Sequence, residues 1–276
     1  MIDTASATFL VTGEYRRFCE FADAVRRDRY IGLCYGPPGV GKTLSARHYA
    51  HWDAAETYLA RSYLPLDSSD WVAPLPPDDL AESRTVVWTT PIMTASSRIS
   101  RNVSDLCRRM DTVIRRLPTS RWRQKIPGGF PHVELLICDE ADRLTTTGLE
   151  ELRDLYDRSG IGLILVGMPG LQRRLARYPQ LYSRVGFAHE YRPLARTELL
   201  QVITGHHHEL GLALPDGVTL EDPDALTAIT QITGGNLRLV QRLFTQINRI
   251  IEINNLTGVT RDVVETARSS LIIGGP

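Results

Sequence analysis

The sequence has very little lysine, no net charge and no long apolar run. Only Lys42 and Lys125 are lysines among the 32 basic residues, and 32 acidic residues balance them. A neutral chain creates no overall field that would draw it to nucleic acid or to a membrane surface. No apolar stretch approaches the roughly 18 residues that a membrane span requires, and the N-terminus has no signal-peptide pattern. We therefore expect a cytoplasmic protein without a membrane partner.

Cysteine is also scarce, and its spacing does not match a metal site. The chain has four cysteines, which are Cys19, Cys34, Cys107 and Cys138. Two of them lie in apolar segments that we expect to be buried strands, so we interpret them as core thiols in a reducing compartment. An apolar content of 42% over 276 residues is enough for one large domain or two small ones.

A glycine-rich motif indicates a nucleotide site. Residues 36–43 read Gly-Pro-Pro-Gly-Val-Gly-Lys-Thr, between an apolar segment over 29–35 and a helical pattern over 44–60. The glycines let the backbone N–H groups turn towards phosphate oxygens, and the positive end of the next helix adds to their attraction. Lys42 would reach the β- and γ-phosphates of ATP, and the Thr43 hydroxyl would bind Mg²⁺. The predicted nucleotide contacts are Gly36, Pro37, Pro38, Gly39, Val40, Gly41, Lys42, Thr43 and Leu44.

A second motif supplies two carboxylates. Residues 135–140 read Leu-Leu-Ile-Cys-Asp-Glu, a buried strand that ends in Asp139 and Glu140. We expect Asp139 to hold Mg²⁺ and Glu140 to polarise the water that attacks the γ-phosphate. These few groups suffice because phosphoryl transfer depends mainly on positioning and charge.

Strand and helix patterns alternate along the first part of the chain. Strand patterns lie at 29–35, 85–90, 134–139, 161–167 and 187–191, and helical patterns lie at 14–27, 44–60 and 147–159. We expect the helix over 147–159 to begin with a capping box of Thr147 and Glu150. The proline-rich, acidic segment 65–83 is typical of a surface loop. The alternation predicts an α/β fold with a doubly wound parallel sheet.

The last part of the chain changes character. Helical patterns lie at 198–210, 223–232, 237–253 and 260–271, with Asp222 and Asn236 as N-caps. We therefore predict a core domain over residues 1–195 and a helical domain over residues 196–276.

The order of these motifs resembles AAA+ ATPases over about residues 10–272, nearly the whole chain. Residues 139–144, Asp-Glu-Ala-Asp-Arg-Leu, and residues 165–171, Leu-Val-Gly-Met-Pro-Gly-Leu, look like the transposition ATPases of the MuB, IstB, TniB and TnsC group. They also look like the secretion ATPase ExeA. The resemblance implies an AAA+ P-loop NTPase fold, with a five-stranded parallel sheet and a C-terminal helical lid.

The resemblance also implies roles for two arginines. Arg184, before the fifth strand, matches the arginine finger that reaches a neighbouring subunit's γ-phosphate, with Arg174 and Arg177 as rival candidates. Because a finger in trans needs a neighbour, a homo-oligomer is expected. Arg238, in the turn Gly-Gly-Asn-Leu-Arg, matches the sensor-two arginine that couples the lid to the nucleotide.

One position departs from the family pattern. The tip of the fourth strand usually carries a small polar residue, but here it carries Met168, whose side chain cannot orient a water in that way. This departure predicts slow hydrolysis, unless Thr145 or Thr146 substitutes.

A basic stripe lies between the second and third strands. Residues 98–125 carry nine basic side chains against two acidic ones, Asp105 and Asp111, which leaves a local net charge of +7. On a helix, the first six fall within an arc of about 120° opposite an apolar face. A row of arginines suits a phosphate backbone and carries no base code. The candidate DNA contacts are Arg98, Arg101, Arg108, Arg109, Arg115, Arg116, Arg121, Arg123 and Lys125. The alternative is a solvated face, paired with the acidic segment 67–82.

Together these features predict an ATPase that assembles on double-stranded DNA when ATP is bound and recruits or activates a transposase. Hydrolysis would release the assembly, which is a ring or a helical filament. The alternatives are a protein-directed AAA+ ATPase, as in secretion, and a relative of replication initiators. An initiator would normally carry a further DNA-binding domain after the lid.

Overall fold

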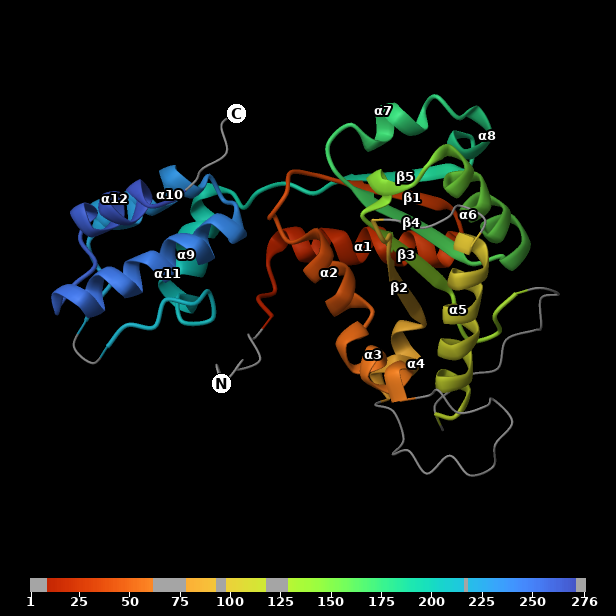
Figure 1. Ribbon diagram of the computed structural model, residues 1–276, viewed down its shortest axis with the longest axis horizontal. Helices are drawn as coiled ribbons and strands as arrows, with labels where there is room; N and C mark the ends of the chain where they lie inside the picture. The colour runs from red at the N-terminus through yellow and green to blue at the C-terminus, as the bar shows by residue number, and fades with distance from the viewer. Residues whose placement is uncertain (1–8, 62–77, 93–97, 118–128, 216–217, 272–276) are drawn as a thin grey trace. The chain divides into compact units, whose positions relative to one another are not determined.

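The structure is a computed structural model and describes residues 9–61, 78–92, 98–117, 129–215 and 218–271. Its central feature is a five-stranded sheet in which every strand pairing is parallel (Figure 1). The strand order is β2-β3-β4-β1-β5. The strands are β1 (Ile31–Tyr35), β2 (Thr85–Thr89), β3 (Leu135–Asp139), β4 (Gly162–Gly167) and β5 (Val185–Glu190).

The inner strands are apolar on both faces, as parallel strands covered by helices require. Every residue of β3 and β4 is buried. The edge strand β5 alternates between half-buried and exposed residues, so only one of its faces packs on the core. This difference explains why the run of apolar residues in β3 and β4 is stronger than the pattern at β5.

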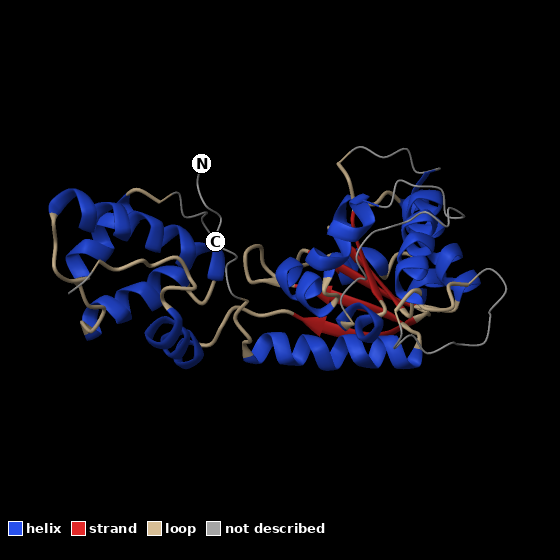
Figure 2. Ribbon diagram, turned by 90° about the horizontal axis from the view of Figure 1, so that it is seen from below, coloured by secondary structure: helices blue, strands red, loops and turns tan. Residues whose placement is uncertain are grey.

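Helices flank the sheet. Helix α1 (Gly13–Asp28) lies below it in the view of Figure 2. Phe21 and Val25 of α1 lie against Gly32 of β1. The helices between β1 and β5 are α2 (Lys42–Tyr49), α3 (Trp52–Arg61), α4 (Asp79–Ser83), α5 (Ile99–Arg115), the 3-10 turn η2 (Ala141–Arg143), α6 (Thr146–Ser159), α7 (Leu171–Leu175) and α8 (Pro179–Tyr182). Within the described ranges, no helix is both long and apolar enough to cross a membrane.

Three local expectations were wrong. The helix expected over 44–60 is broken at His51, which has a left-handed backbone (φ 48°), and resumes as α3. Thr145, not Thr147, caps α6, because its hydroxyl accepts the N–H of Gly148. Part of the segment expected to be a loop forms α4, where Leu80 is fully buried.

The chain divides into two compact units. One contains residues 17–36 and 42–191, and the other contains residues 1–16, 37–41 and 192–276. We call them the core unit and the lid unit. The tip of the glycine-rich loop, Pro37–Gly41, thus belongs to the lid unit, whereas the residues on both sides of it belong to the core unit.

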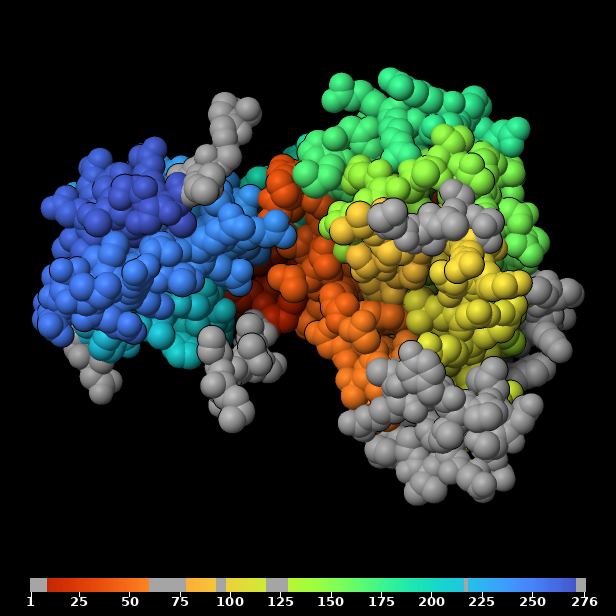
Figure 3. Space-filling model, in the orientation of Figure 1, coloured from red at the N-terminus to blue at the C-terminus, as the bar shows by residue number. Residues whose placement is uncertain are grey.

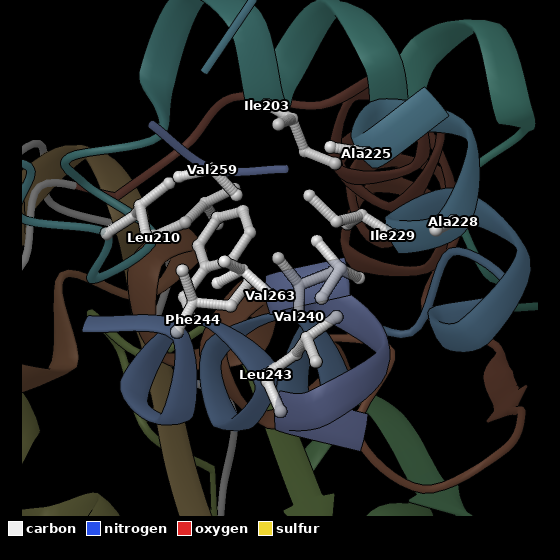
Figure 4. Packing of buried hydrophobic residues seen from close by; sticks show 14 of the residues in the cluster. Ile203, Leu210, Ala225, Ala228, Ile229, Val240, Leu243, Phe244, Val259 and Val263 are labelled. Atoms are coloured by element: carbon white, nitrogen blue, oxygen red, sulfur yellow. The ribbon is translucent and has the colours of Figure 1, made fainter. Parts of the chain in front are cut away.

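The lid unit has its own apolar core, formed by four helices. These are α9 (Arg196–His206), α10 (Pro223–Thr233), α11 (Leu237–Asn254) and α12 (Arg261–Ser269). Phe244 and Leu243 of α11 are fully buried among Ile229 of α10, Ile203 of α9 and Val263 of α12 (Figure 4). As expected, Asp222 caps α10 and Asn236 caps α11.

Candidate functional site: a nucleotide-binding loop and a basic helix

The glycine-rich loop leaves the carboxyl end of β1, next to β4 and β5. Gly36 donates its N–H to the carbonyl of Gly167 (3.3 Å), and a side chain at this position would overlap the Tyr191 carbonyl oxygen. Gly39 and Gly41 have φ values of 82° and 111°, which residues with a side chain rarely adopt. The sequence thus needs glycine at these positions so that the loop can turn back on itself and start α2.

Lys42 opens α2 and is buried. Its ammonium donates to the Gly36 carbonyl (2.6 Å), across the base of the loop. Burial lowers the pKa of Lys42 from its ordinary value, while Cys34 and the carboxylates of Asp139, Asp142 and Glu140 oppose that shift. A buried cation at the base of a glycine-rich loop is a suitable partner for phosphate oxygens.

Thr43 and Asp139 meet beside the loop. The Thr43 hydroxyl donates to Oδ2 of Asp139 (2.7 Å), and Asp139 is only 4% exposed at the end of β3. Oxygen ligands of this kind suit Mg²⁺, which keeps several waters and takes one or two protein ligands plus substrate phosphates. In the described part of the chain, no group of three or more His, Cys, Asp or Glu side chains could hold a metal. Thr43 and Asp139 fit the magnesium role because nucleotide phosphates and water would complete the coordination.

Glu140 differs from its neighbour in its surroundings. Its backbone is left-handed (φ 55°), and its N–H donates to Oδ1 of Asp139 (2.9 Å). Its side chain is 43% exposed and lies 3.7 Å from the Arg143 guanidinium, which also donates to the Thr90 carbonyl (3.0 Å). The two carboxylates therefore differ in their surroundings. Asp139 is buried and bonded to Thr43, whereas the side chain of Glu140 is accessible to solvent.

The tip of β4 is organised by a residue to which the sequence motifs gave no role. Asp142 accepts the N–H of Met168 through Oδ2 (2.6 Å), and this carboxylate occupies the place where a Cβ on Gly167 would lie. The two threonines considered as substitutes are used elsewhere. Thr145 caps α6, and the Thr146 hydroxyl is 2.8 Å from the Tyr178 hydroxyl. Asp142 lies within the Asp-Glu-Ala-Asp-Arg-Leu motif, so its acidic side chain was the available signal.

Within the lid unit, the turn before α11 contacts the loop tip. The side-chain amide of Asn236 donates to the Pro38 carbonyl (2.8 Å), and the backbone N–H of Arg238 donates to the Gly39 carbonyl (3.1 Å). Arg238 itself is exposed. Local patterns predicted the cap at Asn236, but they could not predict its contact with a segment 198 residues away in the chain.

Comparison with known families decides the class. A family described as AAA domain matches residues 25–175, more than half of the chain. The chain belongs to the AAA domain family. The match includes the loop and the carboxylates at the end of β3, so this part of the core unit is a nucleotide-binding AAA domain. It ends before Arg177, Arg184 and Arg238.

Two curated proteins are similar to this AAA protein over most of its length. A Staphylococcus aureus protein named "Potential ATP-binding protein" is 39% identical over 279 residues, which cover 98% of this chain and 99% of that protein. The "Mu-like prophage FluMu DNA transposition protein B" of Haemophilus influenzae is 25% identical over 245 residues, which cover 86% of this chain and 71% of that protein.

Solved structures with the same fold include two DNA-associated proteins. The Holliday junction branch migration motor RuvB of Thermotoga maritima matches with a TM-score of 0.56 at 17% identity, over 96% of this chain and 71% of that chain. The ORC1 protein of Aeropyrum pernix, in complex with DNA, matches with a TM-score of 0.57 at 17% identity, over 96% of this chain and 67% of that chain. Both likenesses concern the fold alone. They confirm the expected AAA+ P-loop NTPase fold.

The three candidate finger arginines have different surroundings in the AAA core. Arg184 precedes β5, where its Nε lies 2.7 Å from Asp157 of α6 and its Nη1 donates to the Gln180 carbonyl. Arg174 donates to the carbonyls of Asp142 and Leu144 and so ties α7 to the turn after β3. Arg177 is exposed, and its guanidinium has no hydrogen-bond or ion-pair partner among the described residues.

The basic helix predicted between β2 and β3 is α5. Its apolar side, with Val103, Cys107, Met110, Val113 and Ile114, is buried. On the other side the arginines are exposed, and the outer surface of α5 is visible in yellow in Figure 3. We define the basic face as Arg98, Arg101, Arg108, Arg115 and Arg116.

One member of the predicted stripe turns away from this face. Arg109 is half-buried and donates to the Leu59 carbonyl of α3. Arg108 forms an ion pair with Asp105 (2.7 Å) on the exposed side. The other three predicted contacts, Arg121, Arg123 and Lys125, lie outside the described residues, as do residues 67–77 of the acidic segment that was the alternative partner.

Proposed function

We propose that this AAA protein is an ATP-dependent DNA-binding regulator of DNA transposition. The observation that carries the proposal is the basic face of α5, a row of exposed arginines on the nucleotide-binding core of a chain that is neutral overall. Arg101, Arg108 and Arg115 follow at seven-residue intervals, about 10.5 Å apart along the helix axis. Such a row fits phosphates of a duplex without reading bases. The likeness to a protein named for DNA transposition supports this use of the face.

ATP would bind with Mg²⁺ in the roles that the geometry suits. Lys42 would contact the β- and γ-phosphates, and Thr43 and Asp139 would hold the metal ion. Glu140 would polarise the attacking water. The 2.7 Å contact between Thr43 and Asp139 supports this assignment, because it brings both oxygen ligands to one place.

The active form would be a homo-oligomer, a ring or a helical filament. Arg184 would act as the finger in trans, and it would have to leave Asp157 to do so. Arg238 would couple the predicted helical domain, residues 196–276, to the bound nucleotide. A head-to-tail interface generates either assembly, depending on whether its rotation closes.

Hydrolysis would be slow and would act as a timer that releases the assembly from DNA. The tip of β4 supports this view because it offers the thioether of Met168 and a backbone N–H that Asp142 already occupies. A transposase would be the partner that the assembled state recruits or activates.

The test is DNA binding by the purified protein with ATP, with a non-hydrolysable analogue, with ADP and without nucleotide, measured as fluorescence anisotropy of a labelled duplex over a salt series. We expect binding with ATP or the analogue that weakens steeply with salt and depends little on sequence. Intact ATP binding without DNA binding in any nucleotide state would contradict the proposal. That result would point to a protein-directed AAA+ ATPase.

A further inference from the structure

The turn before α11 contains a side chain with two simultaneous backbone partners. Asn236 accepts the N–H of Leu239 through Oδ1 (3.2 Å) and donates through Nδ2 to the Pro38 carbonyl (2.8 Å). The two contacts also determine the orientation of the amide, since the reverse orientation would set N–H against N–H and oxygen against oxygen. Among the small residues that favour this cap position, asparagine is the one whose side chain both accepts and donates in fixed directions.

The start of α11 adds a second contact to the same loop tip. The first N–H groups of a helix have no partner within the helix. Here the N–H of Arg238 donates to the Gly39 carbonyl (3.1 Å), one peptide unit beyond the carbonyl that Asn236 holds. Two successive carbonyls of the glycine-rich loop are therefore held by one turn of the lid unit.

Holding these carbonyls determines the direction of the N–H groups behind them. No peptide bond between described residues is cis. In a planar trans peptide, the carbonyl and the following N–H point in opposite directions. The N–H groups of Gly39 and Val40 therefore point away from Asn236 and Arg238. Backbone N–H groups of such loops are the groups that bind phosphate oxygens.

The turn before α11 is also held by the segment that precedes α9. Gly235 has a φ of 80°, and its carbonyl accepts the N–H of Leu194 (3.1 Å). A Cβ on Gly235 would overlap the Leu194 backbone, and a Cβ on Gly39 would overlap Asn236 and Arg238. The two glycines thus permit close contact of the turn with Leu194 on one side and with the loop tip on the other. Because of this close packing, a shift of Asn236 would also move the loop tip.

We propose that Asn236 is a positioning residue for nucleotide binding, which preorganises the phosphate loop by holding the Pro38 carbonyl on the outer side. It acts through the loop and does not touch the nucleotide. This inference rests on the proposed binding of ATP at the loop. Preorganisation raises affinity because the free protein has already lost the freedom that binding would otherwise remove.

Two substitutions separate this role from helix capping. Asn236→Ser is a neutral cap whose shorter side chain cannot also reach Pro38. Asn236→Asp keeps the size and the cap acceptor but cannot donate. The matched control is Asn248→Ser, which removes the same kind of contact, Nδ2 to the Gly211 carbonyl at 2.8 Å, elsewhere in the lid unit.

Calorimetry with ATP and with ADP, in the presence of Mg²⁺, gives the affinities of the full chain. Since one hydrogen bond is lost, we expect both Asn236 variants to bind each nucleotide about five- to tenfold more weakly. The KM for ATP should rise by a similar factor while kcat stays unchanged, because the groups that act on bound ATP remain in place. The melting temperature without nucleotide should fall no further in Asn236→Asp than in Asn248→Ser, because each loses one hydrogen bond of the same kind. Asn248→Ser should match the wild type in its nucleotide affinities, KM and kcat.

Wild-type affinity in both Asn236 variants would overturn the inference. So would a fall in kcat at constant KM, or a loss of affinity that only accompanies a loss of thermal stability, which would mean a purely structural role. Failure of the proposed function would give a different result in the measurements of ATP binding. In that case the wild type itself would bind no ATP, or Lys42→Ala would bind it as well as the wild type does.

Discussion

The glycine-rich loop and the basic face of α5 hold their charged groups in opposite ways. In the loop, Lys42 is buried and directed at the Gly36 carbonyl, and Thr43 is bonded to a buried Asp139. On α5, the arginines project from an exposed surface, and the ion pair of Arg108 with Asp105 is solvent-accessible. Under the proposed function, the affinity of the loop for ATP would therefore lie in a few fixed groups. The affinity of α5 for DNA would be spread over a field that salt can screen.

The largest effect should come from a single change in the loop. Lys42→Ala removes the one cation directed across it, so we expect ATP affinity to fall at least a hundredfold, with little change in the melting temperature. ATP-dependent DNA binding should disappear with it. Calorimetry with ATP checks the first effect, and Lys125→Ala, at the other lysine, is the control for nucleotide binding. If Lys42→Ala still binds ATP, the affinity of the loop for ATP does not depend on this one group, and the contrast with the basic face of α5 does not hold.

The finger substitution tests whether the nucleotide site is completed by a neighbour. Arg184→Ala should lower the hydrolysis rate about a thousandfold while ATP still binds. Adding an Asp139→Ala protein, which keeps Arg184, should partly restore the rate in mixed assemblies. Arg174→Ala should instead lower thermal stability, because the carbonyls of Asp142 and Leu144 lose their donor. If Arg177→Ala, and not Arg184→Ala, abolishes hydrolysis and mixing restores it, the finger is Arg177.

Glu140→Gln separates binding from chemistry at the same site. Its side chain is the more exposed of the two carboxylates, so neutralising it should leave ATP affinity unchanged and slow hydrolysis at least a hundredfold. The complex with DNA should then last longer in ATP. Single-turnover hydrolysis and DNA dissociation measure the two effects. Glu150→Gln, at a surface ion pair of α6, is the control. An unchanged dissociation rate from DNA would argue against hydrolysis as the timer.

The smallest effect concerns how α5 is fixed to the core. His132 is 2% exposed, and its backbone N–H donates to Oδ1 of Asp111 in α5 (2.5 Å). Burial lowers the pKa of His132, Asp111 opposes this shift, and Arg84 and Arg115 add to it. Between pH 6.5, the ordinary pKa, and the lowered pKa of the folded protein, the unfolded chain binds a proton that the folded chain does not. The free energy of unfolding should therefore fall with acidification, by at most about 1.4 kcal/mol per pH unit.

Denaturant titrations at several pH values measure that slope. His132→Gln should show a shallower fall between pH 6.5 and the lowered pKa of the folded protein, and no difference in slope above pH 6.5. Identical slopes in the two proteins would mean that His132 does not contribute to the pH dependence.

The same contrast explains what could be predicted from the sequence. The positions of Gly36 and Lys42 between a strand and a helix, and of Asp139 at the end of a buried strand, were predictable from local motifs. The buried side of α5 was predictable from its periodicity, since Val103 and Met110 recur at helical spacing. Local patterns such as these depend on neighbours in the chain.

The features that could not be predicted depend on distant segments. Arg109 falls within the basic arc by periodicity, yet it reaches Leu59 because α3 packs beside α5. Asn236 contacts Pro38, and Asp142 binds the N–H of Met168, through tertiary packing alone. The break at His51 depends on a left-handed residue that helical periodicity does not reveal.

The central claim is that ATP binding in the loop enables the basic face of α5 to bind DNA. The most direct measurement compares the wild type with a charge-reversal variant, Arg101→Glu, Arg108→Glu and Arg115→Glu, in ATP-dependent DNA binding and ATP affinity. A variant with the same charge change in the lid unit, at exposed Arg242, Arg249 and Arg268, is the control. We predict that the α5 variant binds DNA much more weakly, with a salt slope that is flatter by about three, while its ATP affinity is that of the wild type. Unchanged DNA binding in the α5 variant, or an equal loss in the control, would contradict the account.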